Sequence, residues 1–279
     1  MTHERQWRKN LYEQHDFGDN YTDPSLFLKD LQKNKNVKIF TFKEAVRGAT
    51  RLTNQISCIC AFLIVFYYMY TENVTPTKFL LATSLTVLIG YFLYTGRNFR
   101  LNVLLEDSKT LLTVLVFGYM LSPLLHTLTD AISTDTIFSM TFFVMFLHLI
   151  YFDYGLKAAI VSKAISLNAA IFGSVCLASR LASSYHAFVL LVVSAGFFVL
   201  FPIFTNKFWN PIMIIPLVSI CSFCLYHISI PVVTTYVVIL IFVNLVCPYI
   251  FVVKQKHKNN INGPWDEAIV KETNCDLIN

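Results

Sequence analysis

Three groups of polar side chains in an otherwise apolar chain have the types and spacing that could do chemistry. In the first group, His126 and Asp130 are four residues apart, so on a continuous helix they would share a face and could pair. Asp135 follows and could cap a helix that begins near Ile137. Carboxylates beside an apolar run are usually solvated or act as caps. We therefore expect His126, Asp130 and Asp135 to have structural roles or to contact another subunit.

The other two groups are His148 with Asp153, and Arg97 with Arg100. Guanidinium groups at positions 97 and 100 could hold an anionic lipid headgroup or a nucleotide phosphate through paired hydrogen bonds. The competing interpretation is that these charges only orient the chain in a membrane. We predict that Arg97 and Arg100 contact a lipid headgroup, and that His148 and Asp153 have structural or subunit-contact roles.

No sequence pattern typical of a catalytic or metal centre accompanies these groups. The cysteine pairs 58/60 and 221/224 lie in apolar segments without a histidine or further pair at zinc spacing, which indicates packing residues. The chain lacks an Asp-x-Asp, with which metal-dependent glycosyltransferases commonly bind a nucleotide sugar. It also lacks a Gly-rich phosphate loop, a Gly-x-Ser-x-Gly elbow and a His-Glu-x-x-His. We therefore predict no catalytic residue, no metal and no cofactor.

The elements that must position the polar groups are helices that cross a membrane. Of 279 residues, 55% are hydrophobic and 14% are charged, and the mean hydropathy is +0.56. A soluble domain carries about 25% charged residues, and a spanning helix needs roughly 17 to 25 apolar ones. The apolar stretches predict about eight crossings, within 56–70, 78–94, 110–128, 137–152, 156–178, 185–205, 211–228 and 232–253. The predicted fold class is an all-α polytopic transmembrane helical bundle.

The basic residues gather on one side of these predicted crossings. Lys and Arg are favoured in short loops that face the cytoplasm, and only Lys78 and Arg180 fall in the opposite loops. We predict that both termini are cytosolic, in agreement with an even number of crossings. Topology explains most of the formal charge of +5, so nucleic acid is not a predicted partner.

The predicted domain organisation is one bundle between two tails. A basic cytosolic N-terminal tail with interfacial helices covers 1–54, the transmembrane bundle covers 55–253, and a cytosolic C-terminal tail covers 254–279. Asp23 followed by Pro24 has the form of a helix start. Farther along this tail, an apolar stripe at helical spacing predicts a helix on the bilayer surface: Phe42, Ala45, Val46, Ala49 and Leu52.

The fifth predicted crossing has a small residue at every fourth position: Ala158, Ser162, Ser166, Ala170, Ser174, Ala178 and Ala182. Small side chains let helix backbones approach closely in lipid. A row with this spacing drifts by about 40° per step, so only part of it can face one neighbour. We predict that Ala170 and Ser174 pack against another helix or a partner subunit. Chance Ala and Ser content is the alternative.

Several strings from one tail to the other carry a resemblance: Trp7-Arg8-Lys9-Asn10-Leu11-Tyr12, Ser133-Thr134-Asp135-Thr136-Ile137, Phe152-Asp153-Tyr154-Gly155, Ser174-Val175-Cys176-Leu177-Ala178-Ser179-Arg180-Leu181 and Gly263-Pro264-Trp265-Asp266-Glu267-Ala268. In combination they resemble the PIG-C family, which supplies the C subunit of phosphatidylinositol N-acetylglucosaminyltransferase. The similarity extends along the whole chain.

This resemblance implies a complex in the endoplasmic reticulum membrane that transfers N-acetylglucosamine from UDP-GlcNAc to phosphatidylinositol, the first step of GPI-anchor biosynthesis. It further implies that the sugar-nucleotide chemistry belongs to PIG-A, with PIG-H, PIG-P, PIG-Q and PIG-Y as further partners. The chain would then be a multi-pass, non-catalytic subunit that scaffolds the complex and positions the lipid acceptor.

Two other functions stay open at this point. One is a stand-alone transporter or lipid scramblase, and the other is an integral-membrane glycosyltransferase that acts by itself. Transporters usually have internal repeats and charged groups near the middle of the membrane. Neither feature is evident in the sequence, which disfavours the transporter.

Overall fold

The structure is a computed structural model that describes residues 32–33, 39–96, 101–129, 131–154, 161–208, 210–258 and 261–262. Over these residues the chain is almost entirely helical, and β1 and β2 form only a two-residue antiparallel ladder. The elements are β1 (Gln32–Lys33), α2 (Phe42–Tyr70), α3 (Pro76–Thr95), α4 (Leu101–Thr127), α5 (Thr134–Tyr151), α6 (Lys163–Ala178), α7 (Ser184–Ala195), η2 (Gly196–Leu200), α8 (Phe201–Lys207), η3 (Pro211–Met213), α9 (Ile214–Ile228), α10 (Ile230–Ile241), η4 (Phe242–Val246), α11 (Cys247–Lys254), η5 (Gln255–His257) and β2 (Ile261–Asn262).

Seven helices in the described part of the chain are long and apolar enough to cross a membrane. Three of them are composite, namely Ser184–Lys207, Pro211–Ile228 and Ile230–His257. The predicted all-α, multi-pass fold is confirmed. The fifth predicted crossing, 156–178, corresponds to α6, which begins at Lys163 and has 16 residues. Residues 155–160, including Ala158, lie outside the described residues. Within the described residues the chain therefore has seven helices of spanning length and one shorter apolar helix, where the sequence predicted eight crossings.

Helix α2 begins earlier than the first predicted crossing. It has 29 residues from Phe42, which at 1.5 Å per residue makes it about 44 Å long, against about 30 Å of hydrocarbon. The stripe from Phe42 to Leu52, predicted as a separate interfacial helix, is the first part of this continuous helix. Its placement on the bilayer surface and the predicted boundary at residue 54 remain predictions. The predicted helix start at Asp23 lies outside the described residues.

The chain divides into two compact units, one formed by Phe42–Ile250 and the other by the segments before and after it. In the second unit, the side chain of Gln255 bonds both backbone groups of Phe40, accepting from its N–H at 3.0 Å and donating to its carbonyl at 2.8 Å. The rings of Phe40 and Phe251 are 5.8 Å apart. In the same unit Gln32 pairs with Asn262 across β1 and β2.

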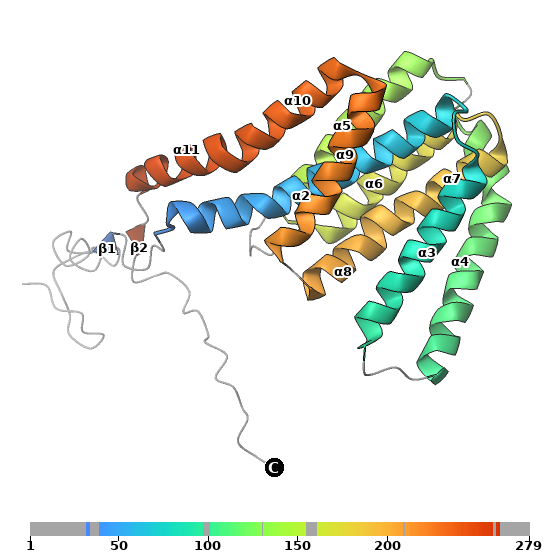
Figure 1. Cartoon of the computed structure of the whole chain (residues 1–279), viewed down its shortest axis with the longest axis horizontal. Helices are drawn as coiled ribbons and strands as arrows, with labels where there is room; N and C mark the ends of the chain where they lie inside the picture. The colour runs from blue at the N-terminus through green and yellow to red at the C-terminus, as the bar shows by residue number, and fades with distance from the viewer. Residues whose placement is uncertain are drawn as a thin grey trace, which may run out of the picture. The chain divides into compact units, whose positions relative to one another are not determined.

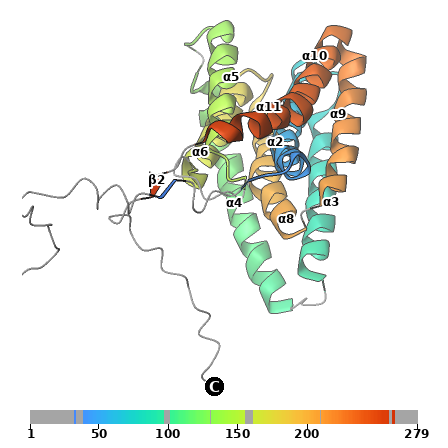
Figure 2. The same ribbon diagram turned by 90° about the vertical axis from the view of Figure 1, so that its left-hand side faces the viewer.

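The larger unit is a helical bundle around α2, α6 and α7 (Figure 1). Helices α5 and α6 form the most extensively packed pair, while α2 packs against α9, α7 and α5. Helices α3 and α4 both pack against α7 at one edge of the bundle. In both views the ends of α3 and α4 near their connecting segment extend past the end of α8 (Figures 1 and 2).

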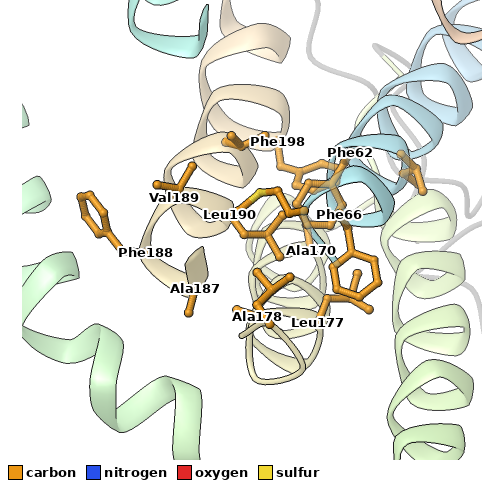
Figure 3. Packing of buried hydrophobic residues seen from close by; sticks show 14 of the residues in the cluster. Phe62, Phe66, Ala170, Leu177, Ala178, Ala187, Phe188, Val189, Leu190 and Phe198 are labelled. Carbon is orange, nitrogen blue, oxygen red and sulfur yellow. The ribbon is translucent and has the colours of Figure 1, made fainter. Parts of the chain in front are cut away.

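The core of the bundle lies where α2, α6 and α7 meet (Figure 3). Phe62 and Phe66 of α2 face Leu190 of α7 and the small side chain of Ala170 of α6, all of them buried. The ring of Phe62 contacts that of Phe198 edge to face at 5.2 Å. Lipid tails are as apolar as these side chains, so close packing rather than removal from water holds such a core together.

Serine side chains cap three of the described helices. Ser133, Ser162 and Ser183 precede α5, α6 and α7, and each side chain accepts a hydrogen bond from the backbone N–H three residues later. Such caps satisfy N–H groups that have no partner within the helix. The prediction that Asp135 caps α5 is therefore wrong, because Ser133 is the cap. Asp135 lies in the first turn, where its charge is favoured by the helix dipole.

In the described part of the chain, π-helical segments interrupt two of the composite spans, and a proline follows each segment. η2 precedes Pro202 and η4 precedes Pro248. Proline cannot donate to the carbonyl four residues earlier and its ring pushes that carbonyl away, so the helix widens locally. Asn244 lies within η4, and its side chain donates to the Thr53 hydroxyl at 2.7 Å and to the Leu240 carbonyl at 2.8 Å.

Candidate functional site

Helix α2 carries a group of buried polar side chains near its middle: Thr53, Asn54, Gln55 and Ser57. Their bonds reach three other elements. Thr53 accepts from Asn244 of η4, the Ser57 hydroxyl is 2.8 Å from that of Tyr236 of α10, and the Ser57 carbonyl accepts from the Cys221 thiol of α9 at 3.5 Å. Interhelical bonds of this kind hold helices together where no water competes. Polar residues at one level of α2 therefore fix its position relative to its neighbours.

Gln55 takes part in a further bridge, to α5 and α6. Its Nε2 is 2.5 Å from Nε2 of His148, and Nδ1 of His148 is 2.8 Å from the Ser166 carbonyl. A carbonyl only accepts, so Nδ1 carries the proton and Nε2 accepts from the Gln55 amide. Both side chains are 1% exposed. The other end of the amide, Oε1 of Gln55, is buried and has no hydrogen-bond partner among the described residues.

A second layer of polar groups lies next to this bridge, where α5 ends and α6 begins. The Arg51 guanidinium, one turn before Gln55 on α2, donates to the Tyr154 carbonyl. The Tyr154 hydroxyl donates to the Leu149 carbonyl at 2.7 Å, and burial raises the pKa of this hydroxyl, so it keeps its proton at neutral pH. Lys163 forms an ion pair with Asp153 at 3.2 Å.

We call these two layers together the α2–α5–α6 polar cluster: Arg51, Gln55, His148, Asp153, Tyr154, Lys163 and Ser166. The cluster offers hydrogen-bond donors, acceptors and charges. The Ser166 hydroxyl donates to the His148 carbonyl at 3.1 Å, so its proton is engaged with the backbone. In the described ranges no group of three or more His, Cys, Asp or Glu side chains could hold a metal ion. The arrangement is therefore suited to binding a polar group.

Of the residues selected from the sequence, His148 and Asp153 belong to this cluster. Ala170 and Ser174 lie deeper in the bundle on α6, both 0% exposed, and the Ser174 hydroxyl donates to the Ala170 carbonyl at 2.7 Å. The structural or subunit-contact roles predicted for all four residues remain predictions. Sequence reasoning missed Gln55. Its signal was the concentration of polar residues at 53–57, at the start of the first apolar stretch.

At the opposite end of the bundle, His126 and its neighbours connect α4 to the turn between α6 and α7. Nε2 of His126 is 2.8 Å from the Leu181 carbonyl. Arg180 donates to the Thr129 carbonyl and, at 3.2 Å, to the Thr129 hydroxyl. Asp130 lies outside the described residues, so its predicted pairing with His126 remains a prediction.

Arg97 and Arg100 also lie outside the described residues. The ends of α3 and α4 on either side of them are described. There the Tyr91 hydroxyl donates to the Asp107 carboxylate at 2.8 Å, and the Lys207 ammonium donates to the Tyr94 carbonyl at 2.5 Å. The predicted contact of Arg97 and Arg100 with a lipid headgroup remains a prediction.

Comparisons with known proteins show what the chain is similar to. The family model described as phosphatidylinositol N-acetylglucosaminyltransferase (GPI2) matches residues 7–266. The human C subunit of phosphatidylinositol N-acetylglucosaminyltransferase is 38% identical over 97% of this chain and 95% of its own length. The bovine C subunit is also 38% identical, with the same coverage. The GPI2 subunit of Schizosaccharomyces pombe is 26% identical over 95% of this chain and 87% of its own length. No solved structure matches the chain.

Proposed function

The chain belongs to the GPI2 family, that of the C subunit of phosphatidylinositol N-acetylglucosaminyltransferase, and from this membership we propose that it is a non-catalytic membrane subunit of that enzyme. The complex transfers N-acetylglucosamine from UDP-GlcNAc to phosphatidylinositol, the first step of GPI-anchor biosynthesis. The observation that carries the proposal is the 38% identity to the human protein along nearly the whole of both chains. A stand-alone transporter or scramblase finds no support in these relatives.

The proposed role of the chain within the complex is to hold other subunits and to position the lipid acceptor. The partners are subunits of the PIG-A, PIG-H, PIG-P, PIG-Q and PIG-Y types, and PIG-A carries out the sugar-nucleotide chemistry. Apolar helices with many exposed large side chains provide surface for lipid and for partner helices. The lack of an Asp-x-Asp in the sequence agrees with a catalytic site in another subunit.

The proposed location is the endoplasmic reticulum membrane, with both termini in the cytosol. The distribution of Lys and Arg supports this orientation, because only Lys78 and Arg180 fall on the opposite side. With this proposed orientation, the starts of α2 and α6 and the end of α5 lie at the cytosolic leaflet. His126 and Arg180 then lie at the luminal side.

Purification tests this proposal. The tagged chain is isolated from native membranes in mild detergent, the proteins that accompany it are identified, and the preparation is assayed for transfer of N-acetylglucosamine to phosphatidylinositol. We expect the other subunits to accompany the chain, and we expect activity only when they are present. Isolation without companions, or transfer activity from this chain alone, would contradict the proposal. The second outcome would favour an integral-membrane glycosyltransferase.

A further inference from the structure

The α2–α5–α6 polar cluster lies where three helices reach one side of the membrane, and helix packing alone does not account for its charges. We propose that this cluster binds the inositol phosphate headgroup of phosphatidylinositol at the cytosolic leaflet. This inference rests on the proposed function, which makes phosphatidylinositol the acceptor. It assigns the headgroup to described residues on α2, α5 and α6.

The lengths of α5 and α6 bring the cluster to the depth of lipid headgroups. With 18 and 16 residues, the two helices are about 27 Å and 24 Å long, shorter than about 30 Å of hydrocarbon. A bond from the Ser162 N–H to the Tyr151 carbonyl at 3.2 Å joins them at their cytosolic end. A pair shorter than the bilayer draws the headgroups toward its polar end. Asp153, Tyr154 and Lys163 are situated at that end.

The charges of the cluster suit a phosphodiester beside hydroxyl groups. Its described charged side chains are Arg51 and Lys163, which are basic, and Asp153, which is acidic. The Lys163 side chain is 80% exposed while it pairs with Asp153, so its ammonium can approach a phosphate from outside. Cations bind phosphate oxygens through strong, charge-assisted hydrogen bonds. The Asp153 carboxylate can accept a hydrogen bond from an inositol hydroxyl.

The unpaired acceptor of Gln55 is an independent observation that points to a ligand with hydroxyl groups. Oε1 of Gln55 is buried without a donor in the described part of the chain, whereas native proteins rarely leave such an atom unpaired. Exchanging the two ends of the amide does not remove the problem, because Nε2 of His148 can bond to only one of them. Gln55 is one helical turn from Arg51. An inositol hydroxyl bound beside Arg51 would supply the donor that Oε1 lacks.

A nucleotide sugar fits the cluster less well than an inositol lipid. A diphosphate is commonly bound through a divalent ion, and no described cluster of acidic or metal-binding residues could hold one. The aromatic rings of Phe152 and Phe198 contact the His148 ring in T-shaped arrangements, with centroids 5.6 and 5.1 Å from it. The chemistry available is therefore that of a polyol phosphate.

The test uses the purified complex in detergent and lipid micelles, with Gln55→Met and the double variant Arg51→Gln/Lys163→Gln. Gln55→Met keeps the length of the side chain and removes the amide, while the double variant removes charge. The matched control is Lys109→Gln, an exposed lysine on α4. For each complex we measure the subunits recovered, kcat, and KM for phosphatidylinositol and for UDP-GlcNAc.

We expect the double variant to raise KM for phosphatidylinositol about tenfold, and Gln55→Met to raise it several-fold, in keeping with the loss of charge-assisted and neutral hydrogen bonds. KM for UDP-GlcNAc and recovery of the subunits should stay as in the unchanged complex and in Lys109→Gln. A role for Gln55 that only supports folding, or a single water molecule at Oε1, predicts lower thermal stability with an unchanged KM. That result would overturn the inference.

Competition and cross-linking experiments show whether the cluster recognises the inositol phosphate headgroup or the acyl chains of the lipid. Glycerophosphoinositol has the same headgroup without acyl chains, and phosphatidylcholine has acyl chains without the polyol. We expect glycerophosphoinositol to compete weakly, phosphatidylcholine not to compete, and a photoreactive phosphatidylinositol to label this chain near α2 or α6. Label found only on other subunits, with an assembled and active complex, would refute this site and leave the proposed function intact. Failure to assemble with other subunits would count against the proposed function.

Discussion

Two helical hairpins of this chain, α5–α6 and α3–α4, are both rich in apolar residues but are built into the bundle differently. In α5–α6, His148 bonds to Ser166, Tyr151 bonds to Ser162, and the two helices pack along their lengths. In α3–α4, each helix packs mainly against α7, and the hydrogen bond from Tyr91 to Asp107 is exposed. None of the apolar stretch of α3 is buried, against more than half of that of α2.

This difference shows what marks an interior helix in a membrane protein. Apolar composition does not distinguish a helix that faces lipid from one that faces protein, because both environments are apolar. Small residues and bonded polar residues do make the distinction, because they are useful only where another helix lies close. In α6 both kinds are concentrated on the buried face. In α3 the hydroxyls of Ser84 and Thr86 bond to carbonyls of their own helix.

The largest effect should come from enlarging the buried face of α6. Replacing Ala170 and Ser174 together by Leu adds volume where both side chains are 0% exposed, and overpacking at each site costs about 1 to 3 kcal/mol or more. We expect little folded chain and little recovered complex, measured by size-exclusion chromatography in detergent. The control is Ala82→Leu on the exposed side of α3, which should behave as the unchanged chain. Normal recovery of the double variant would contradict the close packing of α6.

The next largest effect should follow from removing His148. His148→Leu leaves the Gln55 amide and the Ser166 carbonyl without a bond that they now have, and each unpaired buried group costs about 1 to 3 kcal/mol. The apparent melting temperature of the purified chain should fall clearly. Tyr91→Phe, which removes the exposed bond between α3 and α4, should lower it by much less. Equal effects of the two substitutions would remove the distinction between the hairpins.

Glycine substitutions should have opposite signs in the two hairpins. A Cβ at Gly173 of α6 would lie 2.8 Å from Cε of Met145, whereas a Cβ at Gly90 of α3 would meet nothing within 4 Å. Gly173→Ala should therefore destabilise the fold, because Met145 has to shift. The cost should be only about 1 kcal/mol, because the Met145 side chain is flexible. Gly90→Ala should stabilise by about 0.5 to 1 kcal/mol through helix propensity. Thermal unfolding of both variants in the same detergent measures the two signs.

The smallest effect on stability is expected for Arg97→Ala combined with Arg100→Ala. This double variant tests transfer activity instead. These residues lie between α3 and α4, outside the described residues. If their guanidinium groups contact the lipid headgroup, transfer to phosphatidylinositol should fall several-fold while the complex stays assembled. Unchanged activity would mean that Arg97 and Arg100 serve only to orient the chain in the membrane. Comparison with Arg51→Gln/Lys163→Gln would then show which hairpin receives the headgroup.

The ends of the helices show how far local sequence patterns could be read. The serine caps at Ser162 and Ser183 and the proline at the start of α3 follow rules that involve only nearby residues. Helix α2 starts before the predicted crossing because Lys43, Glu44, Arg47 and Arg51 interrupt the apolar stretch without ending the helix. For α5, the predicted cap was Asp135, but the helix begins two residues before it and Ser133 is the cap.

The sequence by itself determined the class of this protein, its repeated apolar helices, the uneven distribution of its basic residues and its family. These properties depend on composition, on periodicity and on strings of neighbouring residues, none of which requires a folded structure. Only the tertiary structure decided that Gln55, His148 and Ser166 meet, that α6 is short and buried, and that α3 faces outward. The reason is that the bilayer makes most faces of these helices equally apolar, so the choice of neighbours depends on contacts between residues far apart in the chain.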